Sequence, residues 1–152
     1  MKIDTRKFGE TNIDEGKILS MPDGLPGFPG FEQFVLLEDP KSAPFCWFQS
    51  IEAPNLSLVV MNPAVFKSDY QLDLQGLILS KEWKDVKPVE LLIFVVINIK
   101  EEEQEKTITA NLMGPLIVNL NNREVVQMAI SDSAYSHQYD VLKSLSNNDN
   151  TD

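Results

Sequence analysis

The chain has 152 residues, and 23 Asp and Glu side chains against 13 Lys and Arg give it a formal net charge of −10. This length is typical of one domain, and it allows a core large enough to fold without a metal or a disulfide. The negative charge disfavours nucleic-acid phosphates and anionic membranes and favours basic partners, although solubility alone would also account for it. We therefore expect no direct nucleic-acid binding and no membrane binding.

The cysteine content and the N-terminus predict a cytoplasmic protein. Cys46 is the only cysteine, so no intramolecular disulfide can form, which fits a reducing compartment. Residues 1–6 contain no apolar segment of the kind that begins a signal peptide. The longest apolar run, 91–97, is far shorter than a membrane-spanning helix.

Strand signals separated by turn signals dominate the chain. Residues 91–97 are apolar on both faces and rich in β-branched side chains. This pattern indicates a strand that is covered on both sides and disfavours the alternative, part of a buried helix. Trp47 and Phe48 should point to opposite faces of their strand, so we expect one of them to be exposed. The predicted strands are 2–7, 16–20, 34–37, 45–50, 56–61, 91–97, 107–112, 116–120 and 125–130, with a hairpin turn at Asn121-Asn122.

Helical periodicity is scarce, with one short helix expected at 77–85 and a single helical turn at 29–34. The fold class that follows is mainly β: a small antiparallel β-barrel-like single domain with one or two short helices. This domain is predicted to span residues 1–143. The polar residues 144–152 are predicted to form a disordered tail.

A catalytic site would need a nucleophile and a base held in one place. The only histidine, His137, and Cys46 form the one candidate couple, but the apolar surroundings of Cys46 predict a raised thiol pKa and a poor nucleophile. No zinc-ligand spacing is present, and the acidic residues 101–105 lack the pattern of a calcium loop. We therefore expect no enzyme, no cofactor and no metal site. A small enzyme with a Cys46/His137 site and a generic ligand-binding β-barrel remain as alternatives.

Glycine recurs at every third position in the segment 24–30, Gly-Leu-Pro-Gly-Phe-Pro-Gly. This spacing differs from the G-x-G-x-x-G of dinucleotide-binding loops, and the prolines remove N–H groups that a phosphate would need. We interpret the segment as a rigid structural loop in which glycine permits unusual φ values and proline fixes φ. Phe28 and the nearby Phe31 are interpreted as core-packing residues.

The same loop carries a family resemblance. Gly24-Leu25-Pro26-Gly27-Phe28 followed by Phe31 resembles the signature loop of the flagellar assembly factor FliW family. The resemblance covers roughly residues 1–140 and continues in order through Phe8-Gly9, residues 45–50, Pro54, Leu56, Asn62-Pro63, Asp69-Tyr70, residues 109–112, Pro115, Asn119, Gln127 and Tyr135. The sequence departs from the family at Cys46, where a second aromatic is common, at Asn62, where an aspartate is common, and at 136–138, where a basic residue is common.

The resemblance implies a compact β-barrel-like module without catalysis or cofactor that binds flagellin in the cytoplasm before export. It also implies binding to the RNA-binding translational regulator CsrA, which relieves the repression of flagellin mRNA. The net charge of −10 fits such a basic partner, because an acidic protein is steered toward it and repels its RNA.

Four residues are predicted as partner-binding candidates. Phe66, Asp69 and Tyr70 follow the Asn62-Pro63 turn, where a loop can present an aromatic and acidic patch, although structural roles fit them equally well. Asn111 lies on the polar side of its strand and either satisfies loop backbone groups or faces a partner.

Overall fold

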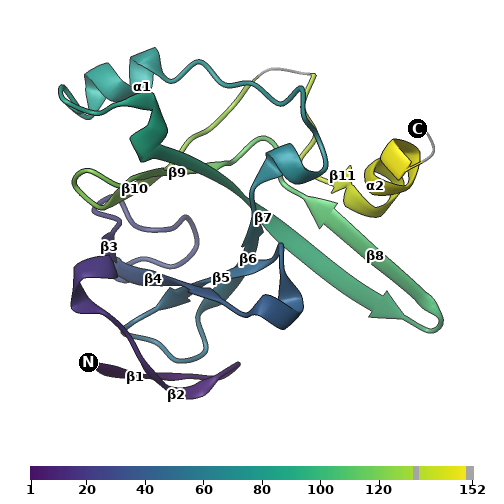
Figure 1. The fold of residues 1–152 in the computed structure, drawn as a ribbon, viewed down its shortest axis with the longest axis horizontal. Helices are drawn as coiled ribbons and strands as arrows, with labels where there is room; N and C mark the ends of the chain where they lie inside the picture. The colour runs from purple at the N-terminus through teal and green to yellow at the C-terminus, as the bar shows by residue number, and fades with distance from the viewer. Residues whose placement is uncertain (132–133, 150–152) are drawn as a thin grey trace.

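Strands dominate the computed structural model, which describes residues 1–131 and 134–149 (Figure 1). The strands are β1 (Lys2–Thr5), β2 (Gly9–Asn12), β3 (Leu19–Ser20), β4 (Gln33–Glu38), β5 (Cys46–Ser50), β6 (Ser57–Met61), β7 (Leu91–Glu102), β8 (Glu105–Ala110), β9 (Leu116–Asn119), β10 (Glu124–Gln127) and β11 (Tyr139–Asp140). The helices are α1 (Gln75–Ser80) and α2 (Val141–Asp149), with 3-10 turns η1 (Glu15–Lys17), η2 (Pro40–Ser42), η3 (Pro63–Val65) and η4 (Pro88–Glu90). The predicted mainly β fold class with short helices is confirmed.

The larger sheet is curled and has the strand order β11-β8-β7-β6-β5-β4-β3-β10-β9. Its neighbours pair antiparallel except for β3 and β10, which are parallel. Strand β9 also pairs with β7, so the sheet returns on itself and encloses an apolar core. Strands β1 and β2 form a separate hairpin that lies below β4 in Figure 1.

Strand β7 extends well beyond the predicted run 91–97. Its residues 91–94 pair with β9, 95–96 with β6, and 97–102 with β8. The last of these pairings forms a hairpin arm that leaves the curled sheet (Figure 1). The strand continues through its charged end because Glu101 lies opposite Lys106, with their charged groups 3.8 Å apart, and the chain turns only at Glu103, whose φ is 56°.

Both aromatic residues in the middle of β5 are buried, so the expectation that one is exposed is wrong. Phe48 stacks on Phe34 inside the curled sheet, with ring centroids 4.4 Å apart. Trp47 points to the other face, where the edge of Phe8 covers it at 5.2 Å. Phe8 lies in the turn of the β1–β2 hairpin, so this hairpin covers Trp47. The alternation of side chains along β5 alone does not predict that a separate hairpin packs on its outer face.

The glycine loop has the backbone conformation that its sequence predicts. Gly24, Gly27 and Gly30 have φ values of 68°, 88° and 91°, which side chains with a Cβ adopt with strain. The positive φ at Gly30 also excludes the helical turn expected at 29–34, and β4 begins inside that range instead. Phe28 is 42% exposed, so its predicted role in core packing is wrong.

Phe31, by contrast, is half-buried and packs against the core inside the curled sheet, as predicted. Strand β3 is shorter than the predicted 16–20, because the side chain of Asp14 accepts a hydrogen bond from Gly16 N and caps the turn η1.

Helix α1 is a short helix that begins before the predicted 77–85 and ends at Ser80. The chain leaves the helical conformation at Glu82, whose φ is 57°, and Trp83 then inserts beneath the helix. Trp83 is 4% exposed and donates a hydrogen bond from Nε1 to Glu124 Oε2 at 3.3 Å. This contact fixes the α1 segment against β10.

Helix α2 crosses the predicted boundary between domain and tail and includes residues 144–149. Asp140 Oδ1 accepts a hydrogen bond from Lys143 N at 2.9 Å in the first turn of this helix. Val141 is buried, and Leu145 packs against the same apolar cluster beside β7 and β8. Residues 150–152 lie outside the described residues, and the domain boundary at 143 stays a prediction.

Gln49 is a fully buried polar side chain on β5. Its Nε2 lies 2.9–3.4 Å from four backbone carbonyl oxygens, those of Ser50, Ala53, Pro54 and Leu56. These carbonyls belong to the end of β5 and to the turn between β5 and β6. One amide group therefore ties the turn together. It acts beside backbone donors, since Arg6 N, Ser50 N and Leu56 N donate to the carbonyl oxygens of Pro54, Leu56 and Ala53.

We predict that Gln49→Leu lowers the free energy of unfolding by about 2 kcal/mol, because it removes the buried side-chain hydrogen bonds that tie the turn after β5 together. Urea unfolding followed by tryptophan fluorescence measures the change. Gln33→Leu, at an exposed position of the neighbouring β4, is the matched control and should change stability by less than about 0.5 kcal/mol. Equal stability of both variants would contradict the assigned role.

Candidate functional site

The segment after β6 places three of the predicted partner-binding residues beside the end of β8. The side chain of Asn62 caps η3 by accepting a hydrogen bond from Ala64 N at 2.9 Å, which aims the following residues toward β8. Tyr70 Oη then donates a 2.6 Å hydrogen bond to the carbonyl oxygen of Leu112. Leu112 follows Asn111 directly, so the structure brings all four candidates to one region.

Phe66 is 1% exposed and lies within this region as a core residue. Its ring stacks on Tyr139 with centroids 5.7 Å apart, and its carbonyl oxygen accepts a hydrogen bond from Ser144 Oγ. The side chain thus links the 66–70 segment to β11 and α2. A direct contact between Phe66 and a partner would require this packing to open.

Lys67 and Asp69 form the charged part of the region. Their Nζ and Oδ1 atoms are 3.0 Å apart, and Lys67 Nζ also lies 5.5 Å from the ring centroid of Tyr139. The hydrogen bond and the positive charge of Lys67 lower the pKa of Asp69, and the hydrogen bond that Lys67 donates to Asp69 raises the pKa of Lys67. The Asp69 side chain is 79% exposed, so its carboxylate is ionised and accessible to a partner.

Tyr70 and Tyr135 form an edge-to-face pair with ring centroids 4.8 Å apart. Tyr135 Oη bonds both backbone polar groups of Gln71, accepting from its N–H and donating to its carbonyl oxygen, each at 3.2 Å. Burial, and secondarily the proximity of Tyr135, raises the pKa of Tyr70 well above its usual range. Tyr70 is therefore neutral and serves as a hydrogen-bond donor.

Asn111 has a structural role that is visible in its hydrogen bonds. Its Oδ1 accepts from Met113 N at 3.0 Å, and its backbone N–H donates to Val96 O at 3.0 Å. It also packs against Gly114, where an added Cβ would come within 3.1 Å of Asn111 Nδ2 and 2.9 Å of Gln127 Nε2. Asn111 shapes the bend between β8 and β9, and any contact with a partner stays a prediction.

We call the group formed by Lys67, Asp69, Tyr70, Tyr135 and Tyr139 the tyrosine surface. Sequence reasoning did not select Lys67, Tyr135 or Tyr139 as site residues, although Tyr135 belongs to the family resemblance. The two tyrosines are four residues apart in a polar segment, and only the pairing of β11 with β8 brings them to the 66–70 segment. No local pattern in the chain signals that pairing.

Cys46 and His137, the two residues of the alternative catalytic site, lie outside the tyrosine surface. Cys46 is on β5 and packs against the core, and burial, with a smaller effect from the negative charge of Glu38, raises the pKa of its thiol. His137 is exposed in the turn before β11. A raised pKa leaves Cys46 in the protonated, poorly nucleophilic form.

Across residues 1–131 and 134–149, no group of three or more His, Cys, Asp or Glu side chains is placed to hold a metal ion. Within the same residues, no helix has both the length and the apolar character needed to cross a membrane.

Comparison with known proteins identifies the family. The family model described as FliW protein matches residues 2–141, which is nearly the whole chain. The chain belongs to the FliW family. Among its relatives, the flagellar assembly factor FliW of Treponema denticola is 35% identical over 145 residues, covering 95% of this chain and 96% of that protein. That of Caldanaerobacter subterraneus subsp. tengcongensis is 34% identical over 152 residues, covering 97% of each.

The FliW fold is likewise shared. A crystal structure of the flagellar assembly factor FliW superposes with a TM-score of 0.80 at 26% sequence identity, covering 93% of this chain and 96% of that one. The resemblance drawn from the glycine loop and the collinear residues is therefore confirmed. The mainly β fold described above is thus shared with a FliW protein of known structure.

We predict that Asp69 titrates below its ordinary pKa of 3.8 because Lys67 stabilises the carboxylate. A carbon-detected NMR titration of the side-chain carboxyl measures this, and Lys67→Gln should return the pKa toward the ordinary value. Since the folded pKa is lowered, the stabilising effect of the pair is present above the ordinary pKa and is lost as the pH falls through the folded pKa. Lys100→Gln, on the hairpin arm, is the control that should leave the titration unchanged, and an ordinary pKa in the unmodified protein would contradict the pairing.

Proposed function

We propose that this protein binds flagellin in the cytoplasm as a chaperone of flagellar assembly, and binds CsrA to relieve its repression of flagellin mRNA. The observation that carries the proposal is membership of the FliW family over residues 2–141, with relatives described as flagellar assembly factors. Both roles are stoichiometric binding, without a catalysed step or a cofactor.

For flagellin, we propose the tyrosine surface as the contact region. Tyrosine rings supply contact area at low entropic cost, and they are common among residues that dominate binding energy. Here Tyr135 and Tyr139 are half-buried, so their packing holds the rings in place while part of each stays accessible. Asp69 adds an exposed carboxylate at the same place. Leu142, on the adjacent α2, adds an apolar side chain that is 41% exposed.

For CsrA, we propose that net charge is the main determinant. A chain with a charge of −10 is attracted to a basic RNA-binding surface and repels the phosphates that compete for it. Four carboxylates lie close together at the end of the hairpin arm, those of Glu101, Glu102, Glu103 and Glu105, and all four residues are exposed. The acidic surface is thus accessible on an element that extends away from the curled sheet (Figure 1).

We predict that this protein and the flagellin of its own organism form a stoichiometric complex in size-exclusion chromatography and titration calorimetry. Asp69→Lys should weaken that complex at least tenfold, because Asp69 is the more exposed of the two charged residues of the tyrosine surface and the substitution reverses its charge. Asp85→Lys makes the same change in net charge at an exposed position after α1 and should have little effect. Absence of a complex at tens of micromolar protein would refute the flagellin role, and equal losses in both variants would refute the contact region.

We also predict that this protein displaces a flagellin-leader RNA from the organism's own CsrA in a filter-binding or mobility-shift assay. The displacement should weaken as salt is raised, since attraction between exposed charges is screened. A quadruple variant with Gln at 101, 102, 103 and 105 should displace less RNA than the unmodified protein. A variant with Gln replacing Asp4, Glu10, Glu15 and Glu32, all exposed, removes as much charge outside the hairpin arm and is the control. Unchanged RNA binding at saturating concentrations of this protein would refute the CsrA role.

A further inference from the structure

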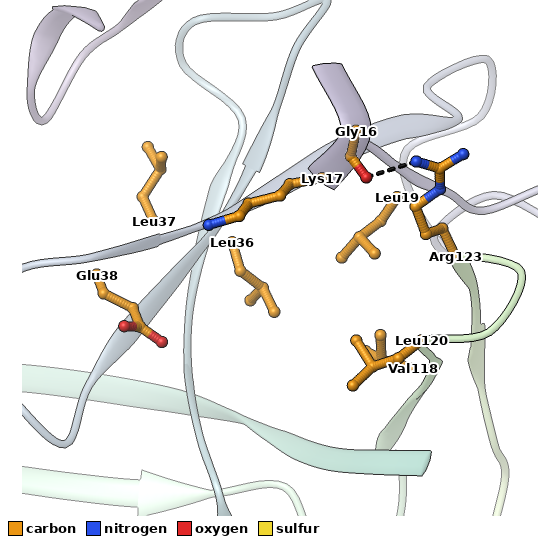
Figure 2. Close-up of a pocket in the computed structure, with 9 residues that line it drawn as sticks. All are labelled: Gly16, Lys17, Leu19, Leu36, Leu37, Glu38, Val118, Leu120 and Arg123. Atoms are coloured by element: carbon orange, nitrogen blue, oxygen red, sulfur yellow. Dashed lines mark hydrogen bonds between the residues drawn. The ribbon is translucent and has the colours of Figure 1, made fainter. Parts of the chain in front are cut away.

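A cavity of about 480 Å³ reaches the apolar interior of the curled sheet between η1, β4 and the β9–β10 turn (Figure 2). Its apolar floor consists of Leu19 and Val118, both buried in the core, and Leu36, which packs against them. Leu120 forms part of the rim and is 48% exposed. The cavity therefore connects solvent to the core, and its size lies in the range of roughly 300–1,000 Å³ that is usual for ligand sites.

Two cationic side chains, Lys17 and Arg123, border this floor. In the view of Figure 2 they lie on different sides of the cavity, with the guanidinium of Arg123 held by a hydrogen bond from Nη1 to the carbonyl oxygen of Gly16. Within residues 1–131 and 134–149, neither cation forms a salt bridge, although acidic residues outnumber basic ones 23 to 13. The positive charges at this cavity are thus available to an anionic group.

Glu38 borders the cavity on the same side as Lys17 in Figure 2. A carboxylate at this point disfavours a ligand that is only a hydrocarbon chain with an anionic head. It favours a ligand that also carries N–H donors, because a carboxylate is a strong acceptor for them. A polypeptide end has all three parts: an apolar side chain, a terminal carboxylate and a preceding peptide N–H.

We propose that this cavity binds the C-terminal residue of a polypeptide whose last side chain is apolar. The side chain occupies the floor of Leu19, Leu36 and Val118, and the terminal carboxylate lies at Arg123, whose planar guanidinium suits two-point recognition of a carboxylate. Lys17 adds positive charge, and Glu38 accepts from the N–H of the residue before. An internal chain segment would leave both cations without an anion, so the terminal carboxylate is the specific determinant.

The test uses the full chain labelled with ¹⁵N and the peptide acetyl-glycyl-glycyl-leucyl-leucine. The free acid should shift amide resonances of residues 16–19, 36–38 and 118–123 in a saturable way. The same peptide with a C-terminal amide should bind at least tenfold more weakly, because it lacks the charge that the two cations recognise. Octanoate, which offers the chain and the carboxylate without the peptide N–H, should bind more weakly than the free acid.

Variants separate the site from general charge effects. Lys17→Gln and Arg123→Asn should each weaken binding of the free-acid peptide several-fold and reduce the protein's preference for it over the amide peptide. Asn is chosen at 123 because φ there is 62°, a conformation that Asn tolerates. Lys100→Gln on the hairpin arm removes the same charge outside the cavity and should change nothing.

Three results would overturn the proposal. They are equal binding of acid and amide, binding of octanoate as tight as that of the peptide acid, and unchanged affinity in both Lys17→Gln and Arg123→Asn. Circular dichroism confirms that each variant is folded before the comparison is made. The result is independent of flagellin and CsrA binding, which are measured separately.

Discussion

The backbone hydrogen bonds of β7 are the constraint on which the other features depend. The first residues of β7 pair with β9, its middle residues with β6 and its last residues with β8. This strand therefore closes the curled sheet and supports the hairpin arm. Buried backbone groups need partners, and a strand that serves three neighbours can have its register changed only by disturbing all of them. The bend at Asn111–Gly114 separates β8 from β9 along the same edge, and it places Leu112 O where Tyr70 reaches it.

Polar side chains inside the fold determine the irregular segments. Gln49 holds the turn after β5, Asn62 caps the turn after β6, and Asn111 shapes the bend after β8. Each does so by hydrogen-bonding backbone groups of the segment that follows its strand. The tyrosine surface is built on two of these three segments. Its geometry therefore depends on the amide side chains of Asn62 and Asn111.

Charge is distributed unevenly over the molecule. Part of the net charge of −10 lies at the end of the hairpin arm. Lys17 and Arg123, which form no salt bridge within residues 1–131 and 134–149, lie beside an apolar cavity far from that arm. Screening limits each exposed charge to a range of about 10 Å at ordinary salt, so the two regions produce separate local fields. A single acidic protein can in this way present surfaces of opposite character.

The sequence by itself determined the class of fold, most strand positions, the conformation of the glycine loop and the family, because alternation, turn residues and collinear motifs are local properties. It also placed Phe66, Asp69 and Tyr70 on one segment. Only the tertiary structure decided that the hairpin of β1 and β2 covers Trp47, that Phe66 is buried, and that Val141 and Leu145 of α2 pack against the cluster beside β8. The partners of Tyr70 and the cavity beside Arg123 likewise join residues far apart in the chain. Such contacts depend on how strands pair over long separations, and no short segment of sequence records that pairing.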